Sequence, residues 1–469
     1  MESAGDWNDP ARSRLWLYNL HYFDDLLAGD GPSRRQWHEA LIQRWIEENP
    51  AGTGSGWEPY PLSQRIVNWI KWALNGNSLT AAALDSLAAQ ARFLRKRIEY
   101  HLLGNHLLAN GKALLFAGLF FEGAEAEKWL RKGADIVSTQ LPEQVLPDGG
   151  HFERSPMYHA IVTEDLLDMI NLMRAYGRRV PEVFEEAAER MLGWLATMTH
   201  PDGGVALFND AAFGIASTPA DLFAYGARLG VALPGNSSGP VRHLKSSGYI
   251  RVEAEDAVAF LDVAPLGPDY LPGHGHADTL TFELSLFGRR FIVDSGTSCY
   301  GLGDERLRQR GTAAHNTVTI NGEDSSEVWA GFRVARRATP KDVEVTASDG
   351  EIVVSASHNG YDRLPGRPRH MRNWVFGENS LRIRDEIRGP FQEAVARFHL
   401  HPDLKVESGE GRSAGVIAMP GGESVSWEAS GGRYFFEEST YHPEFGLSIS
   451  NRCLVVRFDS NEAELLLRW

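Results

Sequence analysis

Apolar residues in the first half of the chain recur at helical spacing. Within residues 36–49, for example, Trp37, Leu41 and Trp45 fall on one face of a helix. Short connections that contain Gly or Pro separate such stretches, and consecutive helices with short links pair antiparallel. A long series of such pairs closes into a bundle or an α/α toroid. The pattern predicts helices at 36–49, 61–74, 79–103, 105–121, 124–140, 159–176 and 181–198.

The pattern changes after residues 233–240, a run rich in Gly, Pro and Ser that marks the best domain boundary in the chain. Beyond it, short β-branched and aromatic runs alternate with Gly-rich turns, which is typical of an antiparallel sandwich of stacked sheets. We therefore expect an α+β multidomain chain with a helical domain at 1–235 and a β domain at 241–469. Predicted strands include 249–252, 258–261, 291–293, 343–345, 352–354, 381–383 and 456–458.

The net charge limits the kinds of molecule that the protein is expected to bind. The chain has 469 residues and a formal charge of −15, which argues against a nucleic-acid partner because phosphate binding needs a basic face. An anionic substrate would require a local cationic pocket. No stretch is apolar enough to span a membrane, and the first residues of the chain as given show no secretion signal.

The β half carries candidate metal ligands. His276, Asp294 and His315 offer two nitrogens and a carboxylate, a set that suits zinc. We expect Asp294 to end the strand 291–293 and His315 to open a strand, so that both would lie on rigid elements. The alternative interpretation is two hydrogen-bonded structural histidines and an aspartate that caps a turn. Only two cysteines are present, which excludes a cysteine-rich zinc site.

His274 lies in the motif GHGHAD at 273–278, two residues before His276. If this stretch is extended, both imidazoles lie on the same side, because strand side chains alternate with period two. His274 is then carried next to the candidate metal site but can point into a cleft. A histidine there is a candidate general base or carboxylate neutraliser, and the alternative is an ordinary loop histidine.

The helical half offers Asn105 and His106, directly after Gly104. Asn105 stands where a helix N-cap is expected, which would explain it without a function. His106 and Asn110 lie one helical turn apart on one face.

Residues 148–159 form a second cluster, in which Gly and Pro predict a loop dense in titratable groups. Tyr158 can act as an acid or base if nearby cations lower its pKa, and Arg154 is one such cation. The alternative is a loop at a helix start whose tyrosine only packs.

Residues 57–65 suggest a further wall of a binding site. Trp57 and Tyr60 can stack on sugar rings, and Arg65 can pair with a carboxylate. With 13 tryptophans in the chain, most belong to the core, so Trp57 alone is a weak indication.

Taken in order, these motifs resemble the heparinase II/III family of polysaccharide lyases, whose architecture alginate oligosaccharide lyases share. The resemblance rests on Asn105-His106, on GGHFERSPMYH at 149–159, on GHGHAD at 273–278, on VDSGT at 293–297 and on HNTV at 315–318. It implies an incomplete α/α toroid followed by an antiparallel β-sandwich, with the cleft between them. It also implies β-elimination at a uronic acid of an anionic polysaccharide or oligosaccharide, and a periplasmic or secreted protein.

The resemblance also implies roles for single residues. Asn105 matches the asparagine that neutralises the substrate carboxylate, with His106 beside it, and Tyr158 matches the acid that in some members is also the base. His274 matches the histidine of the cleft. The ligands of a structural zinc ion are matched by His276, Asp294 and His315. Apart from the resemblance, Arg154, Arg310 and Arg333 are candidate uronate or sulfate contacts that no motif assigns.

Two other functions compete with a lyase. A glycoside hydrolase on an α/α toroid needs two carboxylates that flank the scissile bond, and Asp148 with Glu153 are the one attractive pair in a loop. A glycan-binding or polysaccharide-assembly protein on a lyase scaffold would need no catalysis, and for it the change Tyr158→Phe would be silent. The oligomeric state is open.

Overall fold

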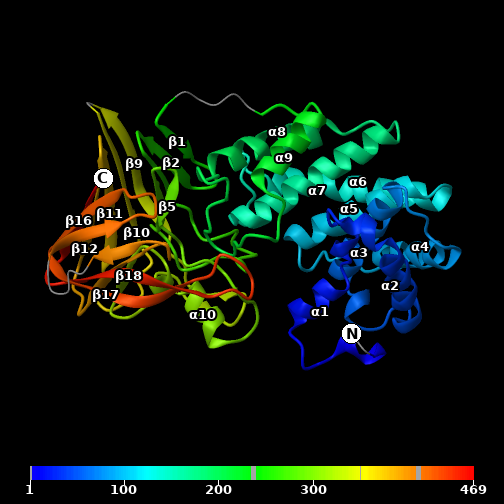
Figure 1. The fold of residues 1–469 in the computed structure, drawn as a ribbon, viewed down its shortest axis with the longest axis horizontal. Helices are drawn as coiled ribbons and strands as arrows, with labels where there is room; N and C mark the ends of the chain where they lie inside the picture. Colours follow the sequence, from blue (N-terminus) through cyan, green and yellow to red (C-terminus); the bar gives the residue numbers. More distant parts are fainter. Residues whose placement is uncertain (1–2, 234–238, 349, 408–412) are drawn as a thin grey trace. The chain divides into compact units, whose positions relative to one another are not determined.

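The computed structural model describes residues 3–233, 239–348, 350–407 and 413–469 (Figure 1). The chain divides into two compact units. The first unit comprises Met1–Gln144 and Val162–Ala188, and the second comprises Val145–Ile161 and Glu189–Trp469. The predicted division near residues 235–241 differs from this one, because the loop before Tyr158 and the residues from Glu189 onward group with the strands. Of the predicted linker at 233–240, residues 234–238 lie outside the described residues.

A helix lies at each of the predicted helical ranges, and the described residues form three further α-helices that the pattern did not indicate: α1, α9 and α10. The α-helices are α1 (Arg14–Leu20), α2 (Arg35–Glu48), α3 (Pro59–Leu74), α4 (Ala81–Arg95), α5 (Gly104–Phe120), α6 (Ala124–Gln144), α7 (Pro156–Ala175), α8 (Glu182–Thr197), α9 (Pro219–Arg228) and α10 (Asp304–Arg310). The third predicted helix was too long, since α4 ends at Arg95 and residues 96–103 form turns.

The first unit is built around α5, which is buried on nearly every side and packs against α3 and α6. Two glycines permit the close approach of α6. A Cβ atom on Gly118 would lie 2.3 Å from the backbone nitrogen of Leu130, and one on Gly133 would lie 2.6 Å from the carbonyl oxygen of Gly111. A larger residue at either position would push the two helices apart.

The second unit contains antiparallel sheets of five strands (β1-β2-β3-β4-β5), eight strands (β14-β15-β16-β19-β12-β11-β10-β9) and four strands (β17-β18-β13-β6), and the pair β7-β8. The strands are β1 (Val241–Leu244), β2 (Tyr249–Ala254), β3 (Ala257–Asp262), β4 (Phe282–Leu286), β5 (Arg289–Ile292), β6 (Val318–Ile320), β7 (Val328–Trp329), β8 (Arg333–Val334), β9 (Pro340–Ser348), β10 (Glu351–His358), β11 (Arg369–Gly377), β12 (Ser380–Arg388), β13 (Ala394–His399), β14 (Lys405–Glu407), β15 (Ala414–Ala418), β16 (Ser424–Ser430), β17 (Gly432–Tyr441), β18 (Ile449–Phe458) and β19 (Glu462–Arg468).

One hydrophobic core joins the three larger sheets. It contains Leu284 of β4, Ile320 of β6, Trp374 of β11 and Leu465 of β19, all buried. Strands such as β11 and β12 alternate buried and less buried residues, as expected of sheets with one face on the core. The predicted antiparallel β-sandwich is therefore confirmed.

None of the helices within the described ranges carries an apolar stretch long enough to cross a membrane.

Candidate active site

A buried carboxylate, Asp210, is the centre of the polar cluster in the second unit. His274 donates from Nδ1 to Asp210 Oδ2 over 2.8 Å, and His276 donates from Nε2 to Asp210 Oδ1 over 2.9 Å. The guanidinium of Arg306 reaches both oxygens of the same carboxylate, with 2.7 Å between Nη2 and Oδ2. Burial by itself would raise the pKa of Asp210, but Arg306 and the two histidines hold it well below its usual range. Asp210 is therefore ionised, and it fixes both imidazoles.

Backbone contacts fix the segment that carries these histidines. The amide of Asp210 donates to the carbonyl of His274 over 3.1 Å, and the amide of His276 donates to Asn209 Oδ1 over 3.0 Å. Between them, Gly275 has no room for a side chain, because a Cβ atom there would lie 2.5 Å from Leu266 Cδ2. The condition considered above, an extended stretch, is not met because these residues form no strand, yet both imidazoles do face one carboxylate.

Tyr158 lies against His274. Their rings are 4.0 Å apart between centroids and tilted by 32°. The hydroxyl of Tyr158 is 3.1 Å from that of Tyr300. At the start of α7, the hydroxyl of Ser155 accepts from the Tyr158 amide and donates to the carbonyl of Asp210. The loop and the histidine segment are thus held together, so the phenol and the imidazole have a fixed geometry.

The side of His274 away from Asp210 is partly open. Its Nε2 atom lies 3.5 Å from a carboxylate oxygen of Glu153, and its side chain is 17% exposed, whereas His276 is fully buried. Tyr300 is half-buried and Phe332 is exposed, and both rings lie within about 6 Å of the imidazole. The two histidines therefore differ as expected: His276 faces the interior and His274 faces accessible space.

The candidate zinc ligands lie close together. The rings of His276 and His315 are 5.3 Å apart between centroids, and His315 donates from Nδ1 to Asp294 over 2.8 Å. Two buried nitrogens, His276 Nδ1 and His315 Nε2, and one oxygen of Asp278 have no hydrogen-bond partner in the part of the chain that the structure describes. These donor atoms suit zinc. Among the same residues, however, no group of three or more His, Cys, Asp or Glu side chains forms a metal-binding cluster.

Burial and charge set the protonation of these groups. Burial lowers the pKa of His276 to about 3, which keeps the imidazole neutral and able to bind a cation. Burial would also lower the pKa of His315, but the Asp294 carboxylate more than offsets this and raises it. His315 does not open a strand as predicted, because it directly follows the 3-10 turn Thr312–Ala314 and β6 begins three residues later. Asp294 likewise lies beyond the end of β5.

Asn105 and His106 belong to the first unit, at the start of α5. The N-cap explanation for Asn105 is wrong, because the N-cap position is Leu103 and Asn105 lies inside the first turn, buried. The His106 ring packs against Tyr60 at 4.4 Å between centroids, and its Nδ1 atom is 3.2 Å from Glu99. Asn110 donates to that same glutamate. The carboxylate-neutralising role of Asn105 and His106 stays a prediction.

Three of the predicted substrate contacts are structural. Trp57 is buried and packs against Trp45 and Phe93. Arg65 is fully buried, donates to the Gly56 carbonyl and Gln90, and lies over the Trp45 ring.

Arg310 is also buried, and its guanidinium holds the carbonyl of Gly275 over 2.8 Å, which fixes the histidine segment. These three predictions were wrong because the side chains reach backbone carbonyls and aromatic rings rather than a surface. Arg154 is half-buried and braces Ser247, while Arg333 is exposed, so their role toward a substrate stays a prediction.

The carboxylate pair expected of a glycoside hydrolase is not available. Asp148 accepts hydrogen bonds from the amides of Gly150, Ser246 and Ser247 and from the Ser247 hydroxyl. Its oxygens are thus engaged in joining two loops. This geometry argues against Asp148 and Glu153 as a catalytic pair.

The sequence interpretation missed several members of the site. Asp210 lies in a loop between elements, and Arg306 and Tyr300 lie on or before α10, a helix too short to show a clear period. The dipeptide Asn209-Asp210 offered one signal, since Asn209 adopts a positive φ of 59° of the kind that Asn tolerates. Nothing in the spacing linked Asp210 to histidines more than sixty positions later.

The chain matches models of one protein family along most of its length. Two family models cover most of it, "Heparinase II/III N-terminus" at residues 27–222 and "Heparinase II/III-like, C-terminal" at 236–469. A heparin-sulfate lyase from Bacteroides stercoris is 25% identical, over 86% of this chain and 66% of its own length. The chain spans about half to two thirds of the length of the curated heparin-sulfate lyases that it matches.

One further curated relative and one solved structure also resemble this chain. FtsZ-localized protein C from Caulobacter vibrioides is 27% identical over 90% of this chain and 76% of its own length. The solved structure of a mutant heparan sulfate lyase from Pedobacter heparinus superposes with a TM-score of 0.70 at 20% identity, over 98% of this chain and 78% of that one. This likeness confirms the predicted fold of an α toroid and a β-sandwich. With both family models matched in order along one chain, the protein belongs to the heparinase II/III family.

Proposed function

We propose that the protein is a polysaccharide lyase that cleaves a uronate-containing glycan by β-elimination. The observation that carries the proposal is the Tyr158 phenol packed on the His274 imidazole, which Asp210 holds in one tautomer. Two proton-transfer groups thus lie side by side next to accessible space, in a chain whose curated relatives include heparin-sulfate lyases.

The reaction accounts for these residue types. A base removes the proton on C5 of the uronate, the C4–C5 double bond forms, the bond from C4 to the glycosidic oxygen breaks, and an acid protonates that oxygen. The C5 proton is weakly acidic, because only the adjacent carboxylate stabilises the carbanion. Donors that neutralise this carboxylate therefore lower the barrier, and Asn105 with His106 are the candidates in this chain.

Tyr158 is the proposed acid. Its hydroxyl has Tyr300 as a partner at 3.1 Å, and Arg306 lies 4.9 Å from the Tyr300 ring. When Tyr300 donates to Tyr158, it stabilises the phenolate that remains after proton transfer. His274 donates to Asp210 from Nδ1, so Nε2 is the atom that can take a proton. His274 serves as base where proton and leaving group lie on opposite faces of the sugar, and Tyr158 serves in both roles where they share a face.

A zinc ion held by His276, Asp294 and His315 is a further part of the proposal. The unpartnered nitrogens of His276 and His315 support it, as does Asp210 behind His276, because ligating histidines usually donate their other N–H to a carboxylate. When bound, the ion would brace the segment that bears His274. Metal analysis of the purified protein should find about one equivalent of zinc. Its removal should lower the melting temperature of the wild type but not of His276→Ala, and a zinc-free protein of unchanged stability contradicts this part.

The lyase proposal is tested with a panel of uronate polymers, including heparan sulfate, hyaluronan, chondroitin sulfate and alginate. Elimination leaves an unsaturated, ultraviolet-absorbing sugar at the new end, and product mass shows no added water. Tyr158→Phe is the inactive control. Cleavage that incorporates oxygen from labelled water, with no chromophore, would show a hydrolase instead.

A non-catalytic role on the same scaffold is the second candidate, favoured by one observation. The relative FtsZ-localized protein C matches more of this chain than the Bacteroides stercoris lyase does, and its name describes a location rather than a reaction. This candidate predicts that Tyr158→Phe leaves the biological role intact. If cells that carry Tyr158→Phe at normal protein levels show the same defect as cells that lack the protein, the non-catalytic role is excluded.

A further inference from the structure

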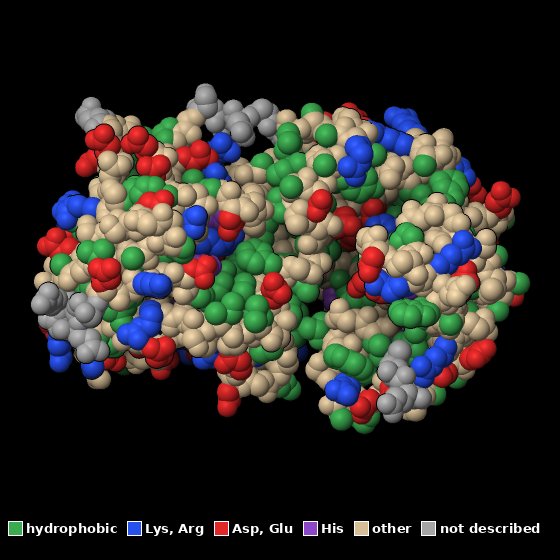
Figure 2. Space-filling view, in the orientation of Figure 1, with side chains coloured by type: hydrophobic (Ala, Val, Ile, Leu, Met, Phe, Trp, Pro, Cys, Tyr) green, Lys and Arg blue, Asp and Glu red, His purple; other side chains and the backbone are tan. Residues whose placement is uncertain are grey.

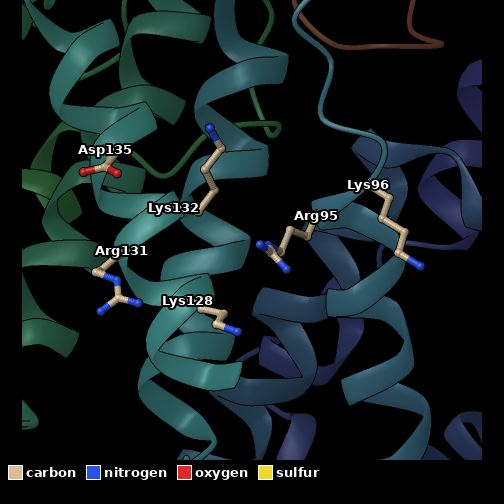
Figure 3. A pocket seen from close by; sticks show the side chains of 6 residues that line it. All are labelled: Arg95, Lys96, Lys128, Arg131, Lys132 and Asp135. Atoms are coloured by element: carbon tan, nitrogen blue, oxygen red, sulfur yellow. The ribbon is translucent and has the colours of Figure 1, made fainter. Parts of the chain in front are cut away.

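An open groove in the first unit is lined mainly by cations. Arg95 and Lys96 lie at the end of α4, and Lys128, Arg131 and Lys132 lie on α6; with Asp135 they line a space of about 610 Å³ (Figure 3). Arg95 extends toward α6 and Lys128 toward α4. We call this feature the basic groove. By contrast, acidic and basic side chains are interspersed on the face drawn in Figure 2.

Nearby acids offset the charge of the basic groove only in part. Glu125 pairs with Arg92 at 2.7 Å while it also attracts Arg95 and Lys128 over longer distances, and Glu127 pairs with Arg178. Across the described ranges, the structure shows no salt bridge for any of the five cations that line the groove. Lys132 has a different partner, the ring of Tyr100, whose centroid lies 5.3 Å from the ammonium.

Helix stability explains only part of this arrangement. Cations at the end of α4 favour the helix dipole, which accounts for Arg95 and Lys96. On α6, Lys128 precedes Arg131 by three residues and Lys132 by four, and like charges at these spacings destabilise a helix by roughly 0.2–0.5 kcal/mol per pair. Glu125, Glu127 and Asp135 stand at the same spacings from these cations and offset this cost. Helix stability therefore neither requires nor opposes the three cations that α6 contributes to the groove.

The chemistry of the basic groove favours an anionic glycan. In a chain of charge −15, a polyanion is attracted only by a local cluster of this kind. Tyr100 is 52% exposed and offers, with Lys132 against it, an aromatic face on which a sugar ring can stack. A duplex nucleic acid needs a broad basic face, which the acidic chain does not offer.

We infer that the basic groove binds carboxylate or sulfate groups of an anionic polysaccharide, through residues other than those proposed to carry out the chemistry. The identity of the polymer rests on the proposed function, whereas binding is measured without turnover. The groove holds a long chain that the enzyme then cuts elsewhere along its length. Short oligosaccharides bound only at the catalytic residues do not use it.

The test compares two double variants in the Tyr158→Phe background, in which turnover should be at least about 10²-fold slower. Lys128→Gln with Arg131→Gln removes two groove cations, and Lys405→Gln with Arg433→Gln removes two exposed cations of the second unit. Each brings the net charge to −17 (−15 minus two). Binding to immobilised heparin and to polymeric alginate should weaken about tenfold at low salt for the groove variant only, with a shallower dependence on salt.

Turnover separates this inference from the lyase proposal. In the otherwise wild-type enzyme, the groove variant should raise KM for polymer several-fold and leave kcat/KM for a short oligosaccharide unchanged. Equal effects of the two double variants overturn the inference, as does retention on DNA or phosphatidylserine vesicles that exceeds retention on glycans. Glycan binding by the basic groove in a protein without lyase activity would refute the proposed function alone.

Discussion

Each unit contains a buried cluster of charged side chains, and the two clusters differ in the groups they use. In the first unit, Lys112 donates to Asp165 and Asp168, each over 2.6 Å, and Lys71 lies 2.5 Å from Asp168. The carboxylates raise the pKa of Lys112 despite its burial, and the two lysines lower that of Asp168 despite its own. Both shifts favour the charged forms of Lys112 and Asp168.

In the second unit, Asp210 binds two histidines and an arginine, and one of those histidines is partly exposed. Histidine is the side chain that gains or loses a proton near neutral pH. Both clusters satisfy buried charges, but only the Asp210 cluster contains histidines, and one of them is partly exposed. Under the proposed function, the first cluster is structural and the second takes part in catalysis.

The largest expected effect comes from Tyr158→Phe, which keeps the ring against His274 and removes only the hydroxyl. Loss of the acid should lower kcat by about 10²–10⁴-fold, while the melting temperature stays within a few degrees of the wild type. Tyr176→Phe, at an exposed tyrosine of the first unit, is the matched control and should be silent. If Tyr158→Phe keeps full activity, the proposed catalytic role of the Asp210 cluster is contradicted.

Matched aspartate substitutions test the comparison directly. Asp210→Asn leaves Arg306 buried without its carboxylate and should destabilise the protein by about 3–5 kcal/mol. Asp168→Asn leaves Lys112 paired with Asp165 alone, so its cost in stability should be smaller. Denaturant unfolding followed by fluorescence measures this loss.

Activity per folded molecule should separate the two variants. Asp210→Asn releases His274 from its fixed tautomer and should lower kcat at least tenfold with a displaced pH profile, whereas Asp168→Asn should retain wild-type kcat and pH profile. Equal losses in both variants would show that the Asp210 cluster is only structural.

Buried histidines should make the protein sensitive to acid. Burial lowers the pKa of His159 to about 3, against an ordinary value of 6.5. Below pH 6.5, His159 binds a proton in the unfolded chain but not in the folded chain. Its contribution to the free energy of unfolding is therefore full above pH 6.5, and it falls toward pH 3 by about 1.4 kcal/mol per pH unit.

His159→Gln should reduce the pH dependence of unfolding between pH 7 and 5, and the exposed His101→Gln should not. A slope unchanged by His159→Gln means that another group dominates the acid response.

The fold could be predicted from periodicity, because helices such as α4 and alternating strands such as β11 each bury a regular face. The site could be predicted only in part. Tyr158, His274 and His276 stand in dense local motifs, but Asp210 shares no local pattern with the histidines that it binds. Arg65 and Arg310 were misjudged because a sequence does not tell an arginine that binds a carboxylate ligand from one that holds buried carbonyls.

The smallest expected effect comes from Tyr300→Phe, which tests whether the Tyr300 hydroxyl assists Tyr158. The phenyl ring keeps its packing on Phe332 and Phe445 and its contact with Arg306, so only the hydroxyl bond to Tyr158 is lost. A single neutral hydrogen bond contributes about 0.5–1.5 kcal/mol, which corresponds to a fall in kcat of at most about tenfold. KM should stay constant, because Tyr300 acts through Tyr158. If KM rises while kcat is unchanged, Tyr300 contacts the substrate itself, and the phenolate of Tyr158 is stabilised by Arg306 alone.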